Sequence, residues 1–269
     1  MASPATWSVV IPYYNEAAFL PATIASLLRQ TVKPFELILV DNGSTDGSGD
    51  LARDALEGVG DVRPVFLLEE RKGQAHALEA GIGRASGAFT AICDADTIYP
   101  PHYLEAAGAV YERSPASVAA VLAVGVGPRP DSVDGRAKRL KTLAMGRLLA
   151  KQCHSGGYAH TFRTATLKRA GGYSKALWPY VLKDHELMHR ISKLGDIRYA
   201  WDLWCQPSDR RADRSGVRWT LPERLLYHAT PFRRKDWFFY EFFGPRLKAR
   251  NMDEIRLRNR SWGEGGESV

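Results

Sequence analysis

The chain has 269 residues, of which 45% are hydrophobic and 25% are charged, and its formal net charge at pH 7 is +7. These proportions are ordinary for a soluble globular protein, and they supply enough apolar material for a sizeable core. No stretch approaches the roughly 18 to 20 uninterrupted apolar residues of a membrane-spanning helix. We therefore expect no membrane-spanning helix in this sequence.

The N-terminal residues and the cysteines bear on the cellular compartment. The N-terminal residues show no basic region followed by an apolar block, so no secretory signal is expected. Cys93, Cys153 and Cys205 are far apart in the sequence, odd in number and without metal-ligand spacing. They predict reduced thiols rather than a disulfide framework. We therefore expect a cytoplasmic protein.

The excess positive charge lies in the last third of the chain. Residues 209–260 contain 14 Arg or Lys against 7 Asp or Glu, so this segment alone carries a surplus equal to the net charge of the chain. Such a block favours an anionic partner. Nucleic acid, a membrane face and a phosphorylated substrate are the three candidates at this point.

The first half of the chain alternates strand-like and helix-like segments. Short apolar runs predict strands, and apolar residues three and four positions apart predict helices. In chain order we predict a strand at 7–12 that is stopped by proline, a helix at 16–30, a strand at 35–40, a helix at 51–56, a strand at 62–68, a helix at 74–84 and a strand at 88–93. This alternation indicates a largely parallel sheet covered by helices on both faces.

The second half is less regular. We predict a helix at 102–112, a strand at 117–126, a basic helix at 135–152, a short strand and helix between two glycine pairs, and a helix at 181–194. No linker rich in Gly, Ser or Pro separates the halves. The sequence therefore predicts one domain over 1–205, with a donor half at about 7–97 and an acceptor half at 98–205. A basic aromatic extension at 206–269 should pack on it, with a disordered tail at 263–269.

Polar side chains follow three of the predicted strands. Asn15, Asp41 and Asp94 each lie just past a strand end. Because ligands of open α/β sheets bind beyond the carboxyl ends of the strands, we expect these residues to converge on one crevice. Asp94 and Asp96 are spaced i, i+2, which places both on one side of an extended segment. Two carboxylates there suit Mg²⁺ or Mn²⁺, although a polar turn after a strand is the simpler alternative.

Three motifs taken together resemble glycosyltransferase family 2. They are Ser8–Glu16 (SVVIPYYNE), Leu39–Gly47 (LVDNGSTDG) and Asp94–Asp96 (DAD), in this order and spacing. Looser similarity extends the resemblance over roughly residues 7–195. The resemblance implies a GT-A fold, an α/β fold with a Rossmann-like, mostly parallel sheet flanked by helices, followed here by a C-terminal helical and aromatic extension. It also implies transfer of a sugar from a nucleotide diphosphate donor to an acceptor hydroxyl, usually with a divalent metal and with inversion at the anomeric carbon.

The resemblance assigns roles to individual residues by position. It places Pro12 and Tyr14 against the nucleotide base, and Asp41 on the base imino N–H, a contact typical of uracil donors. A carboxylate accepts hydrogen bonds and cannot donate them, so it selects a base edge that presents N–H. Asp94 would hold the ribose and assist the metal, and Asp96 would bind Mn²⁺ or Mg²⁺ directly. The implied donor-binding residues are Pro12, Tyr14, Glu16, Asp41, Lys72, Asp94, Ala95 and Asp96.

Lys72 belongs to a basic turn, Arg71–Gln74, that leads into a predicted helix near the donor. A cation and a helix N-terminus both favour a diphosphate. A solvated turn is the alternative interpretation.

Asp184 is the candidate catalytic base, because it takes the place of the aspartate in the family's Glu-Asp element. The residue before it is Lys183, where the family usually has Glu, and this departure affects the expected orientation of Asp184. Glu186 is the second candidate, and an N-capping Asp184 is the structural alternative. Some related enzymes complete the metal shell with a histidine near the C-terminus, and His228 is the candidate here. His154, His160 and His185 are weaker ones.

Residues 219–243 contain nine aromatic side chains beside the cations Arg233, Arg234 and Lys235. Rings with clustered cations suit the membrane interface, so a peripheral membrane contact through 219–250 is one interpretation. Packing of the rings on the domain is the other. No nucleic-acid recognition motif accompanies the charge.

The sequence thus predicts a metal-dependent inverting glycosyltransferase that uses a nucleotide-sugar donor, with a UDP-sugar favoured. Its acceptor would be a glycan or a lipid-linked molecule, reached on the inner face of the membrane. A sugar-phosphate nucleotidyltransferase and a catalytically inactive GT-A binding protein are the alternatives. The first of these predicts a Gly-rich loop with Arg and Lys after the first strand, where this chain has Tyr13, Tyr14 and Asn15 instead.

Overall fold

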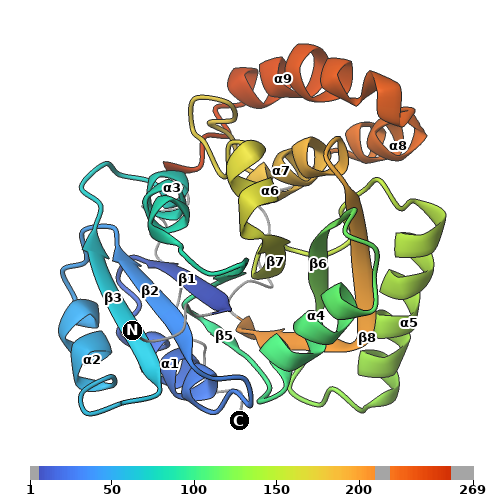
Figure 1. The fold of residues 1–269 in the computed structure, drawn as a ribbon. Coiled ribbons are helices and arrows are strands. Elements are labelled where there is room, and N and C mark those ends of the chain that lie inside the picture. Colours follow the sequence, from blue (N-terminus) through green and yellow to red (C-terminus); the bar gives the residue numbers. More distant parts are fainter. Residues whose placement is uncertain (1–5, 210–218, 256–269) are drawn as a thin grey trace, which may run out of the picture.

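The computed structural model describes residues 6–209 and 219–255. Within them, a sheet of eight strands runs in the order β3-β2-β1-β4-β7-β6-β8-β5 (Figure 1). The strands are β1 (Trp7–Tyr13), β2 (Phe35–Asp41), β3 (Val62–Leu68), β4 (Phe89–Cys93), β5 (Thr97–Ile98), β6 (Val118–Gly125), β7 (Ala159–Arg163) and β8 (Asp196–Pro207). β1 to β4 are parallel to one another, β6 is parallel to β8, and β7 is antiparallel to both of its neighbours. The predicted mixed α/β class is confirmed.

Helices cover both faces of this sheet. They are α1 (Leu20–Leu28), α2 (Ser48–Asp54), α3 (Gln74–Arg84), α4 (Tyr103–Glu112), α5 (Val133–Leu148), α6 (Thr164–Arg169), α7 (Lys183–Ser192), α8 (Leu221–Ala229) and α9 (Gly244–Ala249). A 3₁₀ turn at Phe232–Arg234 and a π-helix at Trp237–Phe243 lie between α8 and α9. Among the described residues, no helix has both the length and the apolar character needed to cross a bilayer.

Two apolar cores lie on opposite faces of the sheet. One core packs α1, α2 and α4 against the strands through residues such as Ile24, Ala52 and Tyr103. The other core packs α3, α6 and α7 through residues such as Leu78, Leu167 and Leu187. Strand residues alternate between the two cores because successive side chains point to opposite faces. The side chain two positions after Ile92 therefore belongs to the face that α3 and α7 cover, and that residue is Asp94.

Several element ends differ from the predicted ones. β1 continues through Pro12 to Tyr13, because at that point β1 pairs only with β2 and the missing N–H removes no second ladder bond. α1 begins at Leu20 rather than at residue 16. Asn15 has a φ of +51°, and the Glu16 carbonyl accepts from the N–H groups of Phe19 and Leu20, which closes a turn before the helix.

β8 was not predicted at all. Its 12 residues alternate irregularly between buried and exposed, and its pairing with β6 shifts register twice, so no clean period of two appears in the sequence. β8 ends at Pro207, two residues beyond the predicted domain end at 205. The division into halves and extension stays a prediction.

The aromatic segment forms a third core. Trp178 and Val181 pack against Tyr227, Phe238, Phe239, Phe243 and Leu247, which come from α8, the π-helix and α9. These elements lie over α6 and α7 in Figure 1. Packing of the rings on the domain is thus confirmed for most of them. The predicted tail at 263–269 and parts of the basic block, 210–218 and 256–260, lie outside the described residues.

Candidate active site

The two carboxylates after β4 are buried, with Asp94 5% and Asp96 4% exposed. The Tyr99 hydroxyl accepts a hydrogen bond from the Asp94 N–H at 2.9 Å and donates to the Tyr158 carbonyl at 2.6 Å, which fixes the backbone at Asp94. Ala95 is also buried, and its carbonyl accepts from the Thr23 hydroxyl of α1 at 2.8 Å. The motif is therefore anchored by the Tyr99 side chain and by Thr23 of α1.

Ser208 holds Asp96. Its hydroxyl donates to Asp96 Oδ2 at 2.8 Å, and its N–H donates to the Asp96 carbonyl at 3.0 Å. Ser208 comes directly after β8, far from Asp96 in the sequence. No sequence motif points to Ser208, because the strand that precedes it shows no clean period of two.

The donor set around Asp94 and Asp96 suits a hard divalent cation. Two buried carboxylates and a hydroxyl are oxygen ligands, and Mg²⁺ or Mn²⁺ can complete its shell with water and substrate phosphates. In the part of the chain that the structure describes, no group of three His, Cys, Asp or Glu side chains is placed to hold a metal. The geometry is compatible with a cation that relies on its nucleotide for the remaining ligands.

Among the described residues, His228 does not form a metal-binding group with Asp94 and Asp96. It lies on α8, where its Nδ1 is 2.7 Å from Gln152 Oε1. Burial lowers the pKa of His228, and the neighbouring His154 and Lys235 lower it further, so the ring is neutral at pH 7. Its role as a metal ligand stays a prediction.

Asp184 lies in the first turn of α7, on the same face of the sheet as Asp94. Its charge reaches two buried residues that also feel Asp94, namely His160 and Tyr173. Burial lowers the pKa of His160 to about 4, and the two carboxylates only partly oppose this effect. Burial also raises the pKa of Tyr173, and Asp184 and Asp94 add to that shift. The structure thus brings the two predicted carboxylates into one electrostatic neighbourhood.

Asp184 does not act as a helix cap. The N-cap of α7 is Leu182, which has a φ of +62°, a strained backbone for a residue with a side chain. A Cβ added at Gly157 would lie 3.3 Å from the Asp184 Cβ, so that glycine allows the close approach.

Glu186, the second candidate for the base, is fully buried. It forms a two-point ion pair with Arg190 at 2.7 and 2.8 Å, and it accepts from the Tyr240 hydroxyl at 2.6 Å. These partners give Glu186 a structural role.

The turn after β2 is built by local hydrogen bonds. Asp41 Oδ1 accepts from the Ser44 N–H at 2.8 Å. Asn15 joins the same turn, because its Oδ1 accepts from the Thr45 N–H at 2.8 Å. The Glu16 N–H donates to Ser48 Oγ at 2.8 Å. These bonds join Asn15 to the Asp41 turn, whereas the predicted convergence of both residues with Asp94 on one crevice stays a prediction.

Asp41 also lines a cleft with a volume of about 500 Å³ beside α2. Its wall contains the aromatic residues Tyr13 and Phe66, and Tyr14 is not among the lining residues. Burial raises the pKa of Tyr13, and the adjacent negative charge of Asp41 raises it further, so the phenol stays protonated. The other lining residues are Ser44, Thr45, Gly47, Gly49, Asp50, Arg53, Leu67 and Leu68. Tyr14 is half-buried, and its stacking role stays a prediction, as does the contact of the buried Pro12 with a base.

In the basic turn before α3, Gln74 contacts Asp94, whereas Lys72 was the residue expected at the site. Arg71 forms a two-point ion pair with Glu69, and Lys72 is exposed. Gln74, the first residue of α3, instead reaches Asp94, with 3.3 Å between its Nε2 and Oδ1. The Asn42 side chain ties this turn to β2, because it donates to the carbonyls of Glu69 and Arg71 and accepts from the Gly73 N–H.

Comparison with known proteins decides the family. The family model described as glycosyl transferase family 2 matches residues 8–168. The chain belongs to glycosyltransferase family 2. Its membership argues against the nucleotidyltransferase.

Two curated relatives are similar to parts of this glycosyltransferase. An uncharacterized glycosyltransferase of Nostoc is 36% identical over 134 residues, which cover 49% of this chain and 39% of that protein. An undecaprenyl-phosphate 4-deoxy-4-formamido-L-arabinose transferase of Serratia proteamaculans is 41% identical over 97 residues, covering 35% of this chain and 30% of that protein. The matches thus span well under half of either relative.

A solved structure supports the fold over nearly the whole glycosyltransferase. The mannosyltransferase PcManGT from Pyrobaculum calidifontis, in complex with GDP-Man and Mn²⁺, aligns with a TM-score of 0.65. The alignment covers 93% of this chain and 71% of that chain, at 22% sequence identity. The GT-A architecture predicted from the motifs is confirmed.

Proposed function

We propose that this glycosyltransferase is a metal-dependent inverting enzyme that transfers a sugar from a nucleotide diphosphate donor, with a UDP-sugar favoured. The observation that carries the proposal is the pair Asp94 and Asp96, buried and anchored after β4, in the same electrostatic neighbourhood as Asp184. The Pyrobaculum structure supports it, because that protein holds a nucleotide sugar together with Mn²⁺. Asp94 and Asp96 would hold the cation here.

In this proposal, the chain's own residues divide into donor and acceptor groups. The cation, when bound, supplies a Lewis acid that stabilises the departing diphosphate. Asp41 accepts the imino N–H of the base. Asp184 accepts the proton of the acceptor hydroxyl as that oxygen forms the new glycosidic bond, because the hydroxyl becomes acidic only then. Its place in the first turn of α7 puts this carboxylate at the positive end of the helix dipole.

Uracil and guanine both present an imino N–H, so Asp41 alone does not separate UDP from GDP donors. We would measure thermal stabilisation of the protein by UDP, GDP, ADP and CDP, each with and without Mn²⁺. We expect the largest metal-dependent shift with UDP. If GDP gave the larger shift, the favoured base would be wrong. If no nucleotide stabilised the protein in a metal-dependent way, the proposal would fail.

Asp96→Asn gives the specific control for this panel. We expect it to remove the Mn²⁺-dependent part of the shift while the protein remains folded. Asp202→Asn is a matched control, since Asp202 is an exposed aspartate on β8. An unchanged metal-dependent shift in Asp96→Asn would contradict the assignment of the metal site.

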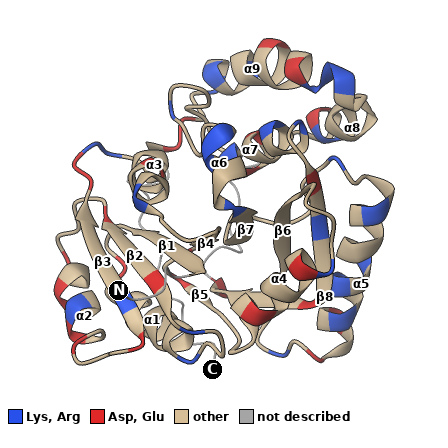
Figure 2. Ribbon diagram, in the orientation of Figure 1, with Lys and Arg blue, Asp and Glu red and all other residues tan. Residues whose placement is uncertain are grey.

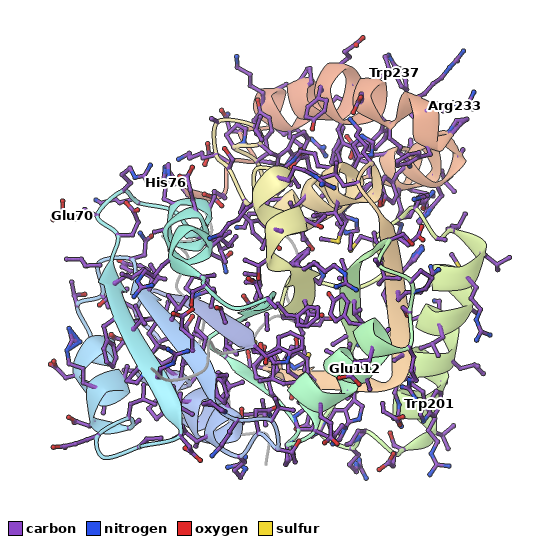
Figure 3. All side chains as sticks on the ribbon, in the orientation of Figure 1. Glu70, His76, Glu112, Trp201, Arg233 and Trp237 are labelled. Carbon is purple, nitrogen blue, oxygen red and sulfur yellow. The ribbon has the colours of Figure 1, made fainter. Side chains whose placement is uncertain are left out.

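We also propose that the acceptor is lipid-linked and is reached from the membrane face. Two features support this proposal. The Serratia relative is an undecaprenyl-phosphate sugar transferase by name, and the C-terminal helices expose apolar and basic side chains. Trp237 is 42% exposed beside Arg233 and Arg234, and α8 exposes Leu221 and Leu225. Figure 3 shows Arg233 and Trp237 on the outer side of these helices, away from the sheet. Lys and Arg recur along α8 and α9 (Figure 2).

Flotation with vesicles that contain anionic lipid tests this contact. The triple variant Arg233→Ala, Arg234→Ala, Trp237→Ala should float less than the wild type. A matched control carries three alanines on the exposed face of α5, at Arg136, Lys141 and Arg147, because α5 is also basic. Equal flotation of the two triple variants would sink the proposed membrane face.

A further inference from the structure

A chain of side-chain contacts runs from the C-terminal segment to Asp94. Glu254 Oε2 pairs with Lys183 Nζ at 2.8 Å. The same Nζ donates to Gln74 Oε1 at 2.8 Å. Gln74 Nε2 in turn lies 3.3 Å from Asp94 Oδ1. Three segments that are distant in the sequence, at residues 74, 183 and 254, thus meet beside the first carboxylate of the candidate metal site.

The chemistry of each group fixes the direction of this relay. An ammonium group only donates hydrogen bonds, and an ionised carboxylate only accepts them. Lys183 must therefore face the carbonyl oxygen of Gln74, and the Gln74 amide must turn its NH₂ toward Asp94. A flipped amide would lose both contacts. The orientation of Gln74, and with it a donor to Asp94, is consequently set by Lys183.

Glu254 is placed for this pairing by the backbone around it. The Val181 N–H donates to the Met252 carbonyl at 3.1 Å, and Tyr180 forms a bridge with Asp253. These bonds hold the segment against the residues that lead into α7. In Figure 1 the segment after α9 reaches the side of α3.

Gly73 makes room for the Glu254 carboxylate. Its φ is +127°, and a Cβ there would lie 2.7 Å from Glu254 Oε1. That same oxygen accepts from the Ala75 N–H at 3.2 Å, in the first turn of α3. The turn before α3 is therefore shaped around a carboxylate that comes from the other end of the described chain.

The burial of this ion pair is informative. The Glu254 side chain is 2% exposed and the Lys183 side chain is 16% exposed. Desolvation of two charges largely cancels their attraction, so a buried pair is poor evidence for a purely stabilising role. Position is the better explanation, because Lys183 directly precedes Asp184 and points toward Asp94 through Gln74.

We propose that Lys183 and Glu254 are positioning residues that act through Gln74 to hold the Asp94 carboxylate in its ligand-binding orientation. Lys183 stands where the family usually has Glu. In this chain the C-terminal segment supplies an acidic side chain there, Glu254, which pairs with Lys183. The role of Asp94 in holding donor and metal rests on the proposed function. The coupling from Lys183 to Gln74 does not.

The first test needs no ligand. The side-chain amide of Gln74 is followed by NMR in ¹⁵N-labelled full-length protein, with Gln74→Ala identifying its signals. Lys183→Met should shift these signals and speed their exchange with water, and Lys183→Arg should largely preserve them. Lys193→Met is the matched control, since Lys193 follows the same helix and pairs with Asp236 instead. Unchanged Gln74 signals in Lys183→Met would overturn the proposal.

The second test measures binding of UDP with Mn²⁺ by calorimetry. Loss of a group that orients a metal ligand typically weakens binding by roughly 10- to 100-fold, and we expect this for Lys183→Met. The double variant with Gln74→Ala should bind no more weakly than the weaker single variant, because both remove one relay. Losses that multiply would refute a shared pathway.

Gly73→Ala should displace the Glu254 carboxylate, because the new Cβ would lie 2.7 Å from Glu254 Oε1. It should therefore weaken nucleotide binding although Lys183 itself is unchanged. Circular dichroism and the melting temperature establish that each variant is folded. If the wild type bound no nucleotide with metal, the proposed function would fail, and the NMR signals of Gln74 would still decide whether the relay exists.

Discussion

The turns after β2 and β3 hold their carboxylates with local partners, whereas Glu254 and Glu223 in the C-terminal half rely on distant ones. In the two turns, Asp41 accepts from the Ser44 N–H, and Glu69 pairs with Arg71. In the C-terminal half, Glu254 pairs with Lys183 and Glu223 pairs with Arg250. The first arrangement is preserved within a short turn, whereas the second exists only when remote segments have docked. A substitution in these turns should therefore act locally, and one at a docked pair should act across elements.

Asp184 offers the largest expected effect, because it is the proposed catalytic base. Asp184→Asn would remove this proposed proton acceptor but keep the size of the side chain. We expect kcat to fall by about 10²- to 10⁴-fold, the usual contribution of a general base, while donor affinity is nearly retained. Steady-state kinetics and nucleotide calorimetry measure the two quantities separately. A variant with wild-type kcat would remove Asp184 from the reaction.

Lys235 tests the C-terminal core by pH. Its side chain is buried, with the ammonium 3.7 Å from the centre of the Tyr227 ring, and burial lowers its pKa from 10.5 to about 8. Between these values the unfolded chain binds more protons than the folded one, so the free energy of unfolding should rise as the pH increases from 8 to 10.5. The rise is about 3 kcal/mol at most. Denaturant unfolding across this range measures it.

Lys235→Met should abolish that rise and stabilise the protein at pH 7. Lys248→Met is a suitable control, because Lys248 is exposed on α9. A slope that persisted in Lys235→Met would assign the pH dependence to another group.

Ser208 tests whether a residue delivered by β8 serves the donor half. Ser208→Ala removes the hydroxyl that donates to Asp96 Oδ2. We expect Mn²⁺-dependent nucleotide binding to weaken by roughly 10-fold, as for other groups that orient a metal ligand. Ser174→Ala serves as the control for loss of a hydroxyl elsewhere. Equal affinities of the two variants would show that Asp96 needs no partner from β8.

Thr220 gives the smallest expected effect and shows that local devices also occur in the C-terminal half. It forms a capping box with Glu223 at the start of α8. Thr220→Ala should lower the free energy of unfolding by about 1 kcal/mol, with no change in nucleotide binding. Thr220→Ser should recover most of the loss. A change in donor affinity would contradict this prediction and would indicate that the start of α8 affects nucleotide binding.

Prediction from sequence succeeded where the signal was local. The strands that precede Asp41 and Asp94 are short apolar runs, and each ends in polar residues. The same logic failed for β8, whose exposure pattern depends on a shifted pairing with β6. The assignment of Lys72 to the donor stays a prediction, and the contact of Gln74 with Asp94 could not be predicted, because the Gln74 side chain is held by the remote Lys183.

The sequence by itself determined the family and the α/β class, and it supplied Asp41, Asp94 and Asp96 as candidate site residues, because their motifs are contiguous and lie at strand ends. Only the tertiary structure decided which groups surround them. Ser208, Tyr13, Gln74 and the pair Lys183–Glu254 reach the candidate site through contacts between elements that are remote in the chain. The physical reason is that a hydrogen bond or ion pair across a packed core depends on where whole elements dock, and the local sequence does not encode that.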